Sequence, residues 1–581
     1  MRYLYWTHLL PCVPRIWARQ DPNVGHDHPQ CSAEQFKLDE ILPPTQVVTI
    51  ESRFQQNYTS FGAGPWPALS GLNFCQVQVY VSERHPEQSG KELGPKVLYE
   101  IWLPLSHAEW NGRFQATGGA GFATGMFEAQ LGAAVNSGWA AVSTNGGHGR
   151  YPLNSGDGSW LANEDGSINW TSMSNFAITS LVEQIKIGKA ITKQYFGKEA
   201  HHSYWNGCST GGRQGYAIAQ RFPDLLDGIL AEAPAISFTQ LVTADFWPQL
   251  RMAMTDTYLS NCELEHYRAK LIEKCDVLDG VQDGILDNID DCAFDPFELV
   301  RQKYTFDCHG TKTKFTPAIA QVLVDIQAGP GLHPKSPLFP GFAPGVPLTS
   351  VANITIANDG TRSQNPFRIS ASFLKHLVLK TPDFDLPTLD MPSYLELFGR
   401  ASYELGGMLN ADNPDLSALR ASGTKLLSWH GLNDELIPFQ NTVNYRRKVD
   451  ALLGGTAAVD AFYRLFLAPG VQHCGGGIGP VPRDPLAALV EWVEHDAPPD
   501  TLAAETVNSD GELVTRDVCA WPARSKYMGI SDPKRASSWS CEGGVERVAE
   551  EQSMLGGSRA QHIIGVLADR LDGLGLGLSI G

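Results

Sequence analysis

The pentapeptide Gly207-Cys208-Ser209-Thr210-Gly211 constrains the fold of this chain more than any other feature of its 581 residues. An apolar stretch at 203–205 predicts the end of a strand, and the stretch at 212–221 predicts a helix. A serine in the pattern G-x-S-x-G between a strand and a helix occupies a strained turn, and glycines flank it because side chains there would clash. Three fixed positions also match by chance, but this context favours a nucleophile elbow.

The apolar pattern on both sides of this motif predicts a parallel sheet with helices. Over 31–235 short strands alternate with helical segments, and we expect strands at 97–103 and 139–143 and a helix at 177–195. Strands return at 425–429 and 462–466, after a stretch of different texture that contains an acidic segment and a Pro/Gly-rich segment. The sequence therefore predicts an α/β-hydrolase fold: a catalytic domain of residues 31–235 and 419–545, interrupted by a large inserted lid domain at 236–418.

The two ends of the chain fall outside these domains. Residues 1–30 contain an apolar run typical of a signal peptide, but Pro11 and Pro14 interrupt it and no clear cleavage site follows. We treat this segment as an atypical signal. Residues 546–581 form a C-terminal tail in which no function is recognised.

The composition excludes some partners and indicates a compartment. A net charge of −18 disfavours nucleic acid and anionic membrane surfaces, and no apolar run outside the N-terminus is long enough to cross a bilayer. Eleven cysteines without a C-x-x-C pair suggest disulfides rather than zinc ligands, with Cys275–Cys292 and Cys519–Cys541 spaced as local bonds. N-glycosylation sequons at Asn57, Asn169 and Asn353 also favour an oxidising, extracellular location.

A serine nucleophile needs a base within hydrogen-bond reach and a residue that orients this base. In the predicted fold, the acid and then the histidine follow the serine along the chain. Asp434 comes soon after the strand at 425–429, and His473 follows the next strand, so both fall where loops leave the carboxyl edge of the sheet. We predict Ser209, Asp434 and His473 as the triad. His430 is the alternative base, but it precedes the acid in chain order.

The segment 275–287 places aspartates at short intervals between turn glycines. Calcium binds six to eight oxygens from carboxylates and carbonyls, which this segment can supply. It is not an EF-hand loop, because the spacing differs and no glycine stands at position 6. A solvated acidic turn explains the spacing equally well, so these residues alone leave both interpretations open.

Cys208 immediately precedes Ser209 and Cys474 immediately follows His473, so a disulfide could tie the nucleophile to the base. With the runs Cys208-Ser209-Thr210-Gly211-Gly212-Arg213 and His430-Gly431-Leu432-Asn433-Asp434, this arrangement resembles the tannase and feruloyl esterase family. The similarity extends over roughly residues 31–545 and includes the stretch at 338–342. In that family a CS-D-HC arrangement carries the disulfide.

The resemblance implies roles for individual residues. Ser209 is expected to be the nucleophile, Asp434 the orienting acid and His473 the base, with Cys208 bonded to Cys474. The oxyanion hole is expected to use the N–H of Thr210 and a second N–H within 117–121. We favour Gly119 as this second donor, with Ala120 as the alternative.

The resemblance also decides between the two interpretations of the acidic segment, because related esterases bind calcium there. It implies a structural Ca²⁺ in the lid, which the chemistry of a serine esterase does not need. The matching ligands are the side chains of Asp276, Asp279 and Asp283 and the carbonyls of Val281 and Ile285.

We therefore predict a secreted serine esterase that hydrolyses a small aromatic ester, such as a galloyl or feruloyl ester, and binds neither nucleic acid nor membrane. Two alternatives stay open: an esterase or acyltransferase acting on an aromatic secondary metabolite, and a non-catalytic binding protein on the same fold. The sequence does not fix the oligomeric state or the partners of five cysteines, which are Cys12, Cys31, Cys75, Cys262 and Cys308.

Overall fold

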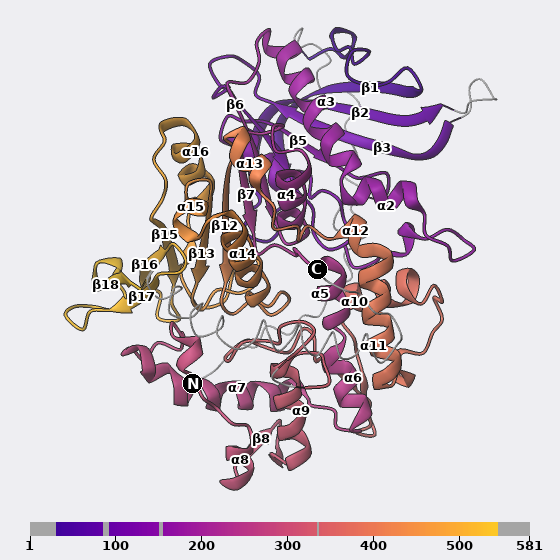
Figure 1. Ribbon diagram of the computed structural model, residues 1–581. Helices are drawn as coiled ribbons and strands as arrows, with labels where there is room; N and C mark the ends of the chain where they lie inside the picture. Colours follow the sequence, from indigo (N-terminus) through magenta and orange to yellow (C-terminus); the bar gives the residue numbers. More distant parts are fainter. Residues whose placement is uncertain (1–30, 85–91, 150–154, 334–335, 544–581) are drawn as a thin grey trace, which may run out of the picture.

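A nine-stranded sheet forms the centre of the molecule (Figure 1). The computed structural model describes residues 31–84, 92–149, 155–333 and 336–543; the predicted signal segment, the predicted tail and Cys12 lie outside them. The strand order is β1-β2-β3-β5-β4-β6-β7-β12-β13, and the six strands from β5 to β13 run parallel to one another. The strands are β1 (Gln46–Ser60), β2 (Leu69–Arg84), β3 (Glu92–Leu103), β4 (Arg113–Thr117), β5 (Ala140–Thr144), β6 (His202–Cys208), β7 (Gly228–Glu232), β12 (Lys425–Gly431) and β13 (Tyr463–Ala468). The mixed, mainly parallel sheet confirms the predicted α/β fold class.

The first third of the sheet differs from the expected alternation of strands and helices. β1, β2 and β3 follow one another without a helix, pair antiparallel, and span 12 to 16 residues each. Antiparallel neighbours need only short connections, whereas parallel neighbours need a crossover, usually a helix. The predicted βαβ pattern is therefore wrong for residues 46–103 and begins only at β4.

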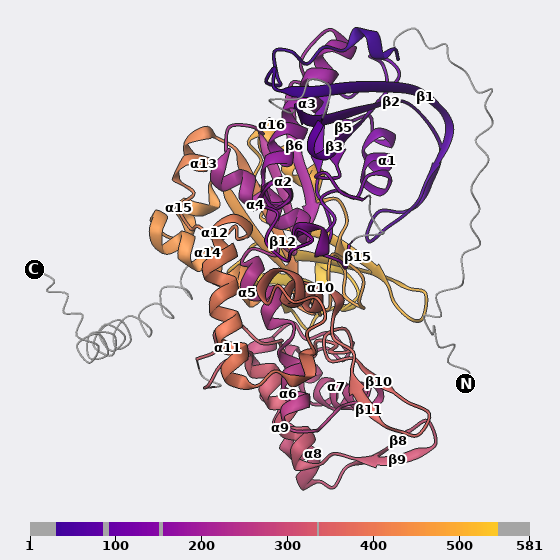
Figure 2. The ribbon, with the colours of Figure 1, turned by 90° about the vertical axis from the view of Figure 1, so that its right-hand side faces the viewer.

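Helices cover both faces of the sheet, as a parallel sheet requires. On one face lie α3 (Thr179–Phe196), α4 (Thr210–Arg221) and α14 (Gln440–Leu453), whose apolar residues share one buried cluster with the strands. On the other lie α1 (Glu128–Asn136) and α16 (Pro485–His495), in a second cluster. Figure 2 shows α1 and α4 on opposite sides of the strands.

The helix expected at 177–195 is confirmed as α3 (Thr179–Phe196), and a separate helix, α2, precedes it. α2 (Trp170–Ala177) ends before Ile178, whose φ of −159° breaks the helical conformation, and α3 starts at Thr179. Within α3, Gly188 lies against the sheet, because a Cβ there would come within 2.7 Å of the Phe114 ring. This close approach explains why a glycine continues the apolar face of the helix.

Most of the chain between β7 and β12 leaves the sheet and lies below it in both views, and its last helix, α13 (Ser417–Ser422), returns beside α4 (Figures 1 and 2). The predicted lid, 236–418, falls within this interval; its independence as a domain stays a prediction. Two apolar clusters fill it, one around α5 and α11 and one around α7 and α9. Its helices are α5 (Phe238–Ala244), α6 (Trp247–Met254), α7 (Asn261–Cys275), α8 (Phe297–Arg301), α9 (Pro317–Ala328), α10 (Arg368–Ser372), α11 (Met391–Arg400), α12 (Gly406–Leu409) and α13 (Ser417–Ser422), with the hairpins β8 (Thr305–Cys308)–β9 (Thr311–Lys314) and β10 (Ile354–Ile356)–β11 (Arg362–Gln364).

A short helix, α15 (Thr456–Asp460), precedes β13. After β13 the chain forms two small antiparallel sheets at the edge of the core. They consist of β14 (Val481–Pro482), β15 (Thr501–Val507) and β16 (Leu513–Cys519), and of β17 (Arg524–Tyr527) and β18 (Trp539–Glu542). Five disulfides bind the described residues together: Cys31–Cys75, Cys208–Cys474, Cys262–Cys308, Cys275–Cys292 and Cys519–Cys541.

Candidate active site

Ser209 occupies the turn between β6 and α4. Its φ of 64° and ψ of −121° lie in a region that non-glycine residues rarely adopt, and its N–H donates to the Glu232 carbonyl at 3.0 Å. A Cβ at Gly207 would lie 2.7 Å from the backbone of residue 211, so the turn closes only because residue 207 is glycine. The sequence thus holds one strained serine at the carboxyl end of a central strand.

Asp434 and His473 lie in the loops after β12 and β13, two neighbouring parallel strands. The Nδ1–H of His473 donates to Asp434 Oδ2 at 2.8 Å. The Cys208–Cys474 disulfide, with a Cα–Cα distance of 5.9 Å, joins the residue before Ser209 to the residue after His473. The structure therefore brings the three predicted residues to one edge of the sheet.

Within the described residues, no hydrogen bond joins Ser209 Oγ to His473 Nε2. Such bonds are often long in enzymes without substrate and shorten only when the substrate binds. The disulfide keeps His473 near Ser209, and the Asp434 contact orients its imidazole.

Asp434 is buried and fully hydrogen-bonded by the chain. Its Oδ1 accepts from the N–H groups of Leu436 and Ile437 at 2.9 and 2.8 Å, and its Oδ2 accepts from His473 and His430. Burial acts to raise the pKa of this carboxyl, but the two histidines outweigh it and hold the pKa well below its usual range. Asp434 is therefore a permanent anion behind the imidazole.

His430, the alternative base, lies behind the acid. It is fully buried, and its Nε2–H lies 3.0 Å from both Asp434 Oδ2 and the Ile437 carbonyl. Its Nδ1 accepts from the Thr442 hydroxyl at 2.9 Å. With both ring nitrogens engaged in the interior, His430 supports Asp434 and has no access to a substrate.

The environment of His473 favours its protonated form. Burial lowers the pKa of the imidazole, but the carboxylates of Asp434 and Glu435 outweigh burial, so its pKa lies above the ordinary value. Glu435 also accepts the backbone N–H of His473 through Oε2 at 3.1 Å. Glu435 belongs to no motif of the sequence, and only its position directly after Asp434 points to it.

The backbone N–H groups around Ser209 include candidates for the oxyanion hole. Thr210 is the first residue of α4, where N–H groups have no acceptor within the helix. The N–H of Gly119 donates to Gln214 Oε1 at 3.0 Å, and that of Ala120 to the Ala123 carbonyl at 3.1 Å. The structure does not support Gly119 or Ala120 as the second donor, because both amides are already hydrogen-bonded.

Gly121 offers another amide in this loop. Its carbonyl accepts from the Thr210 hydroxyl at 2.7 Å, which places it beside the elbow. Its N–H donates to no acceptor among the described residues, and its φ of 56° suits a glycine.

Arg213, in the first turn of α4, connects the elbow to α2 and α12. Its guanidinium is completely buried over the rings of Phe176 and Phe238, and it donates to carbonyls of α2 and to Leu409 O. Burial lowers its pKa to about 9. The position of the helix that begins at the nucleophile is thereby tied to α2 and to the insertion.

The acidic segment forms a tight loop closed by the Cys275–Cys292 disulfide. Asp276, Asp279 and Asp283 each accept a backbone N–H from the loop, at 2.9 to 3.2 Å. Asp287 is also buried, but neither of its oxygens has a hydrogen-bond partner. Burial raises its pKa to about 7, against the opposing effect of Arg516.

Arg516 is the cation beside this loop. Its Nη2 lies 3.6 Å from Asp283 Oδ2 and 3.9 Å from Asp287 Oδ2, too far for a hydrogen bond, and its guanidinium stacks 3.1 Å above the Trp539 ring. This one guanidinium acts on three carboxylates, those of Asp279, Asp283 and Asp287. The predicted ligands do not form a set of oxygens all within 4.8 Å of one another; within the described parts of the chain, only His201, His202 and Glu494 meet that distance.

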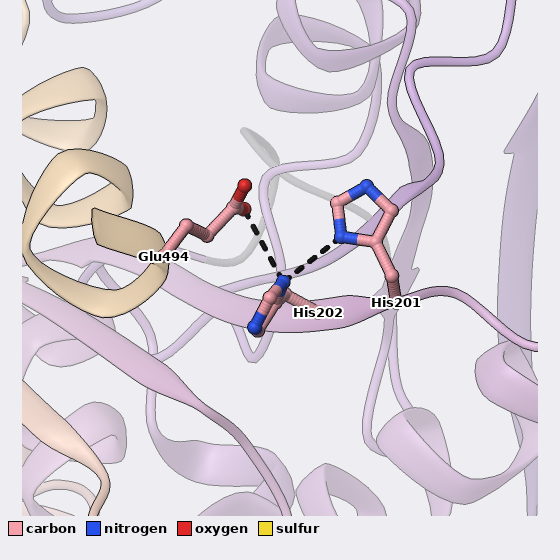
Figure 3. A group of neighbouring side chains, drawn as sticks. All are labelled: His201, His202 and Glu494. Carbon is pink, nitrogen blue, oxygen red and sulfur yellow. Dashed lines mark hydrogen bonds and ion pairs between the residues drawn. The ribbon is translucent and has the colours of Figure 1, made fainter. Parts of the chain in front are cut away.

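This second cluster lies where β6 begins (Figure 3). The two Nδ1 atoms of His201 and His202 are 2.9 Å apart, and His202 Nδ1 lies 3.6 Å from Glu494 Oε1. Glu494 already binds Arg113 through both oxygens at 2.7 Å and accepts from the Tyr204 hydroxyl. Because this guanidinium neutralises the carboxylate, the cluster is an ion-pair network and we assign no metal to it.

A mainly parallel sheet with a serine elbow and an Asp–His pair on the next two loops defines the α/β-hydrolase class. The family model described as "Tannase and feruloyl esterase" matches residues 80–542. A probable feruloyl esterase of Arthroderma benhamiae is 40% identical over 521 residues, covering 89% of this chain and 94% of the relative. Feruloyl esterase C of Talaromyces stipitatus is 30% identical over 498 residues, covering 81% and 86%.

Two solved structures are similar. Feruloyl esterase B from Aspergillus oryzae superposes with a TM-score of 0.71 at 25% identity, covering 88% of this chain and 99% of that one. The tannin acyl hydrolase from Aspergillus niger, at 23% identity, shares the fold with a TM-score of 0.77 and covers 89% and 95%. The chain belongs to the tannase and feruloyl esterase family, and it is a carboxylic ester hydrolase.

No helix within the described residues is long and apolar enough to span a membrane.

Proposed function

We propose that this esterase hydrolyses esters of phenolic acids, with Ser209 as nucleophile, His473 as base and Asp434 as the acid that orients His473. The observation that carries the proposal is the His473–Asp434 pair held next to the strained Ser209 by the Cys208–Cys474 disulfide. The phenolic acyl group is inferred from the names of the relatives, feruloyl esterases, and of the family.

The residues account for each step of the reaction. His473 Nε2 takes the proton as Ser209 Oγ attacks the ester carbonyl, and Asp434 stabilises the imidazolium. The N–H groups of Thr210 and Gly121 stabilise the oxyanion of the tetrahedral intermediate, each worth roughly 3–4 kcal/mol. His473 then protonates the departing alcohol, and water attacks the acyl-enzyme by the same route.

Aromatic residues lie directly beside this machinery. Phe122 follows Gly121 in the chain and packs 6.0 Å, centroid to centroid, from both Phe176 and Phe238. Phe238 in turn packs against Phe373 of the insertion. All four rings are buried in the cluster around α5. They form the core that supports the loop of Gly121, so the phenolic acyl group is inferred from the relatives and not from these rings.

The proposal predicts that Ser209→Ala abolishes ester hydrolysis and leaves the fold intact. Release of acid from methyl ferulate, methyl gallate and methyl butyrate, with circular dichroism as the control for folding, measures this. Comparable hydrolysis by the variant would remove Ser209 from its role. Faster cleavage of the butyrate by the wild type would remove the phenolic substrate class. Product analysis with added alcohol separates hydrolysis from acyl transfer.

We also propose one structural Ca²⁺ in the acidic loop. The two unpartnered oxygens of buried Asp287 support it, together with the oxygen-only donors of Asp276, Asp279 and Asp283 and the carbonyls of Val281 and Ile285. Binding would draw these carboxylates closer together than they stand here. The ion lies in the insertion, so it stabilises the loop and takes no part in the reaction.

Finally, we propose that the protein works outside the cell. Five disulfides support an oxidising compartment. Of the three sequon asparagines, Asn57 is exposed, while Asn169 and Asn353 are half-buried. Mass measurement before and after enzymatic deglycosylation of protein from its native secretome tests both points.

A further inference from the structure

A second pocket lies on the face of the sheet that α1 and α16 cover. It has a volume of about 220 Å³, and its floor consists of side chains from β4, β6, β7 and β12 near their carboxyl ends. α1 forms one wall, and the segment 481–486 forms the other. Residues Pro65 and Trp66 close the mouth, where Trp66 is half-buried.

This pocket contains buried polar groups that the chain does not satisfy. Gln130 is 1% exposed, and neither its Oε1 nor its Nε2 has a hydrogen-bond partner. Asn206 is 8% exposed, and its Oδ1 is also unpartnered. The Nε1 of Trp429, another lining residue, is a fourth buried atom without a partner. An orphaned buried group disfavours the folded state unless something binds it. Four such atoms in the lining of one pocket indicate that a polar molecule completes it.

The remaining lining groups restrict the chemistry of that molecule. Trp139 and Trp429 contribute buried rings, with Trp66 as a third ring at the mouth. Two carboxyl side chains, Glu232 and Asp484, also line the pocket, and burial raises the pKa of Glu232 to about 7. These groups supply no positive charge for an anion. The only basic lining residue, Arg483, keeps its side chain 67% exposed at the rim.

A ligand that fits must therefore be neutral, donate and accept several hydrogen bonds, and present C–H surface to indole rings. A sugar ring has these properties, since its hydroxyls both donate and accept and its ring faces are apolar. We propose that this pocket binds one neutral sugar residue, through the Gln130 amide, the Asn206 carbonyl oxygen and stacking at Trp66.

The site is separate from the reacting centre but close to it. The lining side chain of Asn206 comes from the same strand that ends at Cys208, before the nucleophile. On the other side, a Cβ at Gly475 would lie 3.8 Å from Val481 and 4.0 Å from Pro65, both of which line the pocket. Ser209, Asp434 and His473 are not among the lining residues, so a sugar bound here leaves the reacting centre free.

The experiment measures binding without any ester present, so it does not depend on the proposed function. Ligand-observed NMR and calorimetry with D-glucose, D-galactose, D-xylose and L-arabinose, and with glucuronate as a charged comparator, use the full-length protein. At least one neutral sugar should bind saturably with a dissociation constant on the order of 1 mM, and glucuronate should bind more weakly. The sugar should not compete with methyl ferulate in the hydrolysis assay.

Two variants and a control locate the binding. Gln130→Leu removes both orphan groups and should weaken sugar binding at least tenfold without loss of stability. Trp66→Ala at the mouth should weaken it similarly and keeps the test available if the first variant does not fold. Trp170→Ala removes a tryptophan that is 52% exposed elsewhere, on α2, and should bind as the wild type does.

Three results would overturn the proposal. One is that no neutral sugar binds saturably at concentrations up to 50-fold above the expected dissociation constant. Another is binding that both pocket variants leave unchanged, and the third is competitive inhibition of ester hydrolysis by the sugar. In the first case the pocket holds only water, and in the other two the sugar binds elsewhere.

Discussion

Two buried aspartates of this protein stand in opposite electrostatic situations. Asp434, at the edge of the sheet, accepts four hydrogen bonds from the chain, two of them from histidines, and its pKa lies well below the usual range because these partners outweigh burial. Asp287, in the acidic loop of the insertion, accepts none, and burial raises its pKa to about 7. Both side chains are almost completely inaccessible.

The difference separates a site that the chain completes from one that it does not. A buried carboxylate is stable only when it is paired or hydrogen-bonded. Around Asp434 the fold supplies every partner, so the proposed catalytic pair is organised before substrate arrives. Around Asp287 it supplies only a distant guanidinium, which is why we propose that a bound ion organises this loop.

Exchanging each aspartate for asparagine should affect different properties. Asp434→Asn removes the charge that stabilises the His473 imidazolium, and kcat for methyl ferulate should fall by about 10⁴-fold while the protein stays folded. Asp287→Asn, the matched variant, should leave kcat close to the wild-type value because Asp287 lies in the insertion. Steady-state kinetics of the two purified variants measure this. Equal losses in both would mean that the acidic loop contributes to the reaction.

Removing disulfides extends the comparison to covalent bonds. Cys208→Ala/Cys474→Ala separates the neighbours of Ser209 and His473, and a displacement near 1 Å can lower the rate about a hundredfold. Cys275→Ala/Cys292→Ala removes the bond around the acidic loop and should lower thermal stability with little change in kcat. Activity at 25 °C and thermal unfolding of both double variants provide the measurement. If the first pair keeps full activity, the disulfide does not position the base.

Ser209, Asp434 and His473 could be predicted from the sequence because the patterns that point to them are local. The elbow needs a serine between glycines, a strand and a helix, and the acid and base follow in a fixed order after later strands. The pattern could not reveal that β1, β2 and β3 pair antiparallel, because apolar runs look alike in both arrangements. The pattern also could not show that Gln214, 95 residues away, accepts a hydrogen bond from the N–H of Gly119.

The second pocket shows the same limit more strongly. Gln130, Asn206 and Trp66 come from three distant parts of the chain, and each has an ordinary neighbourhood in the sequence. Only the packing of α1 and α16 on the sheet reveals that the polar groups of Gln130 and Asn206 are buried together without partners. The roles of His430 and Glu435 similarly depend on which atoms meet around Asp434 and His473.

Removal of calcium should act on the acidic loop and not on the catalytic edge. A ligand that binds only the folded state stabilises it by about 2.7 kcal/mol at a hundredfold excess over its dissociation constant. Chelation should therefore lower the unfolding temperature and leave the initial rate at 25 °C unchanged, and metal analysis of the untreated protein should find one calcium per chain. Asp287→Asn should reduce the calcium content. A chain that contains no calcium after dialysis against it would contradict the proposed site.

The smallest effect concerns the pH dependence of the base. The pKa of His473 is raised, with burial opposing and Asp434 and then Glu435 as the charges that raise it. Only the neutral imidazole can take the proton of Ser209, so kcat/KM falls as the pH drops through this pKa, and the acid limb should lie above the ordinary histidine value near 6.5.

Glu435→Gln removes one of the charges that raise the pKa of His473 but keeps an oxygen that can accept the His473 N–H. The acid limb of the kcat/KM profile should move to lower pH. The plateau at alkaline pH should stay at the wild-type level, because the Asp434 contact is untouched. The profile of kcat/KM against pH for the two proteins measures both quantities. A lower plateau with an unmoved limb would mean that Glu435 holds the loop in place and does not act on the proton affinity of His473.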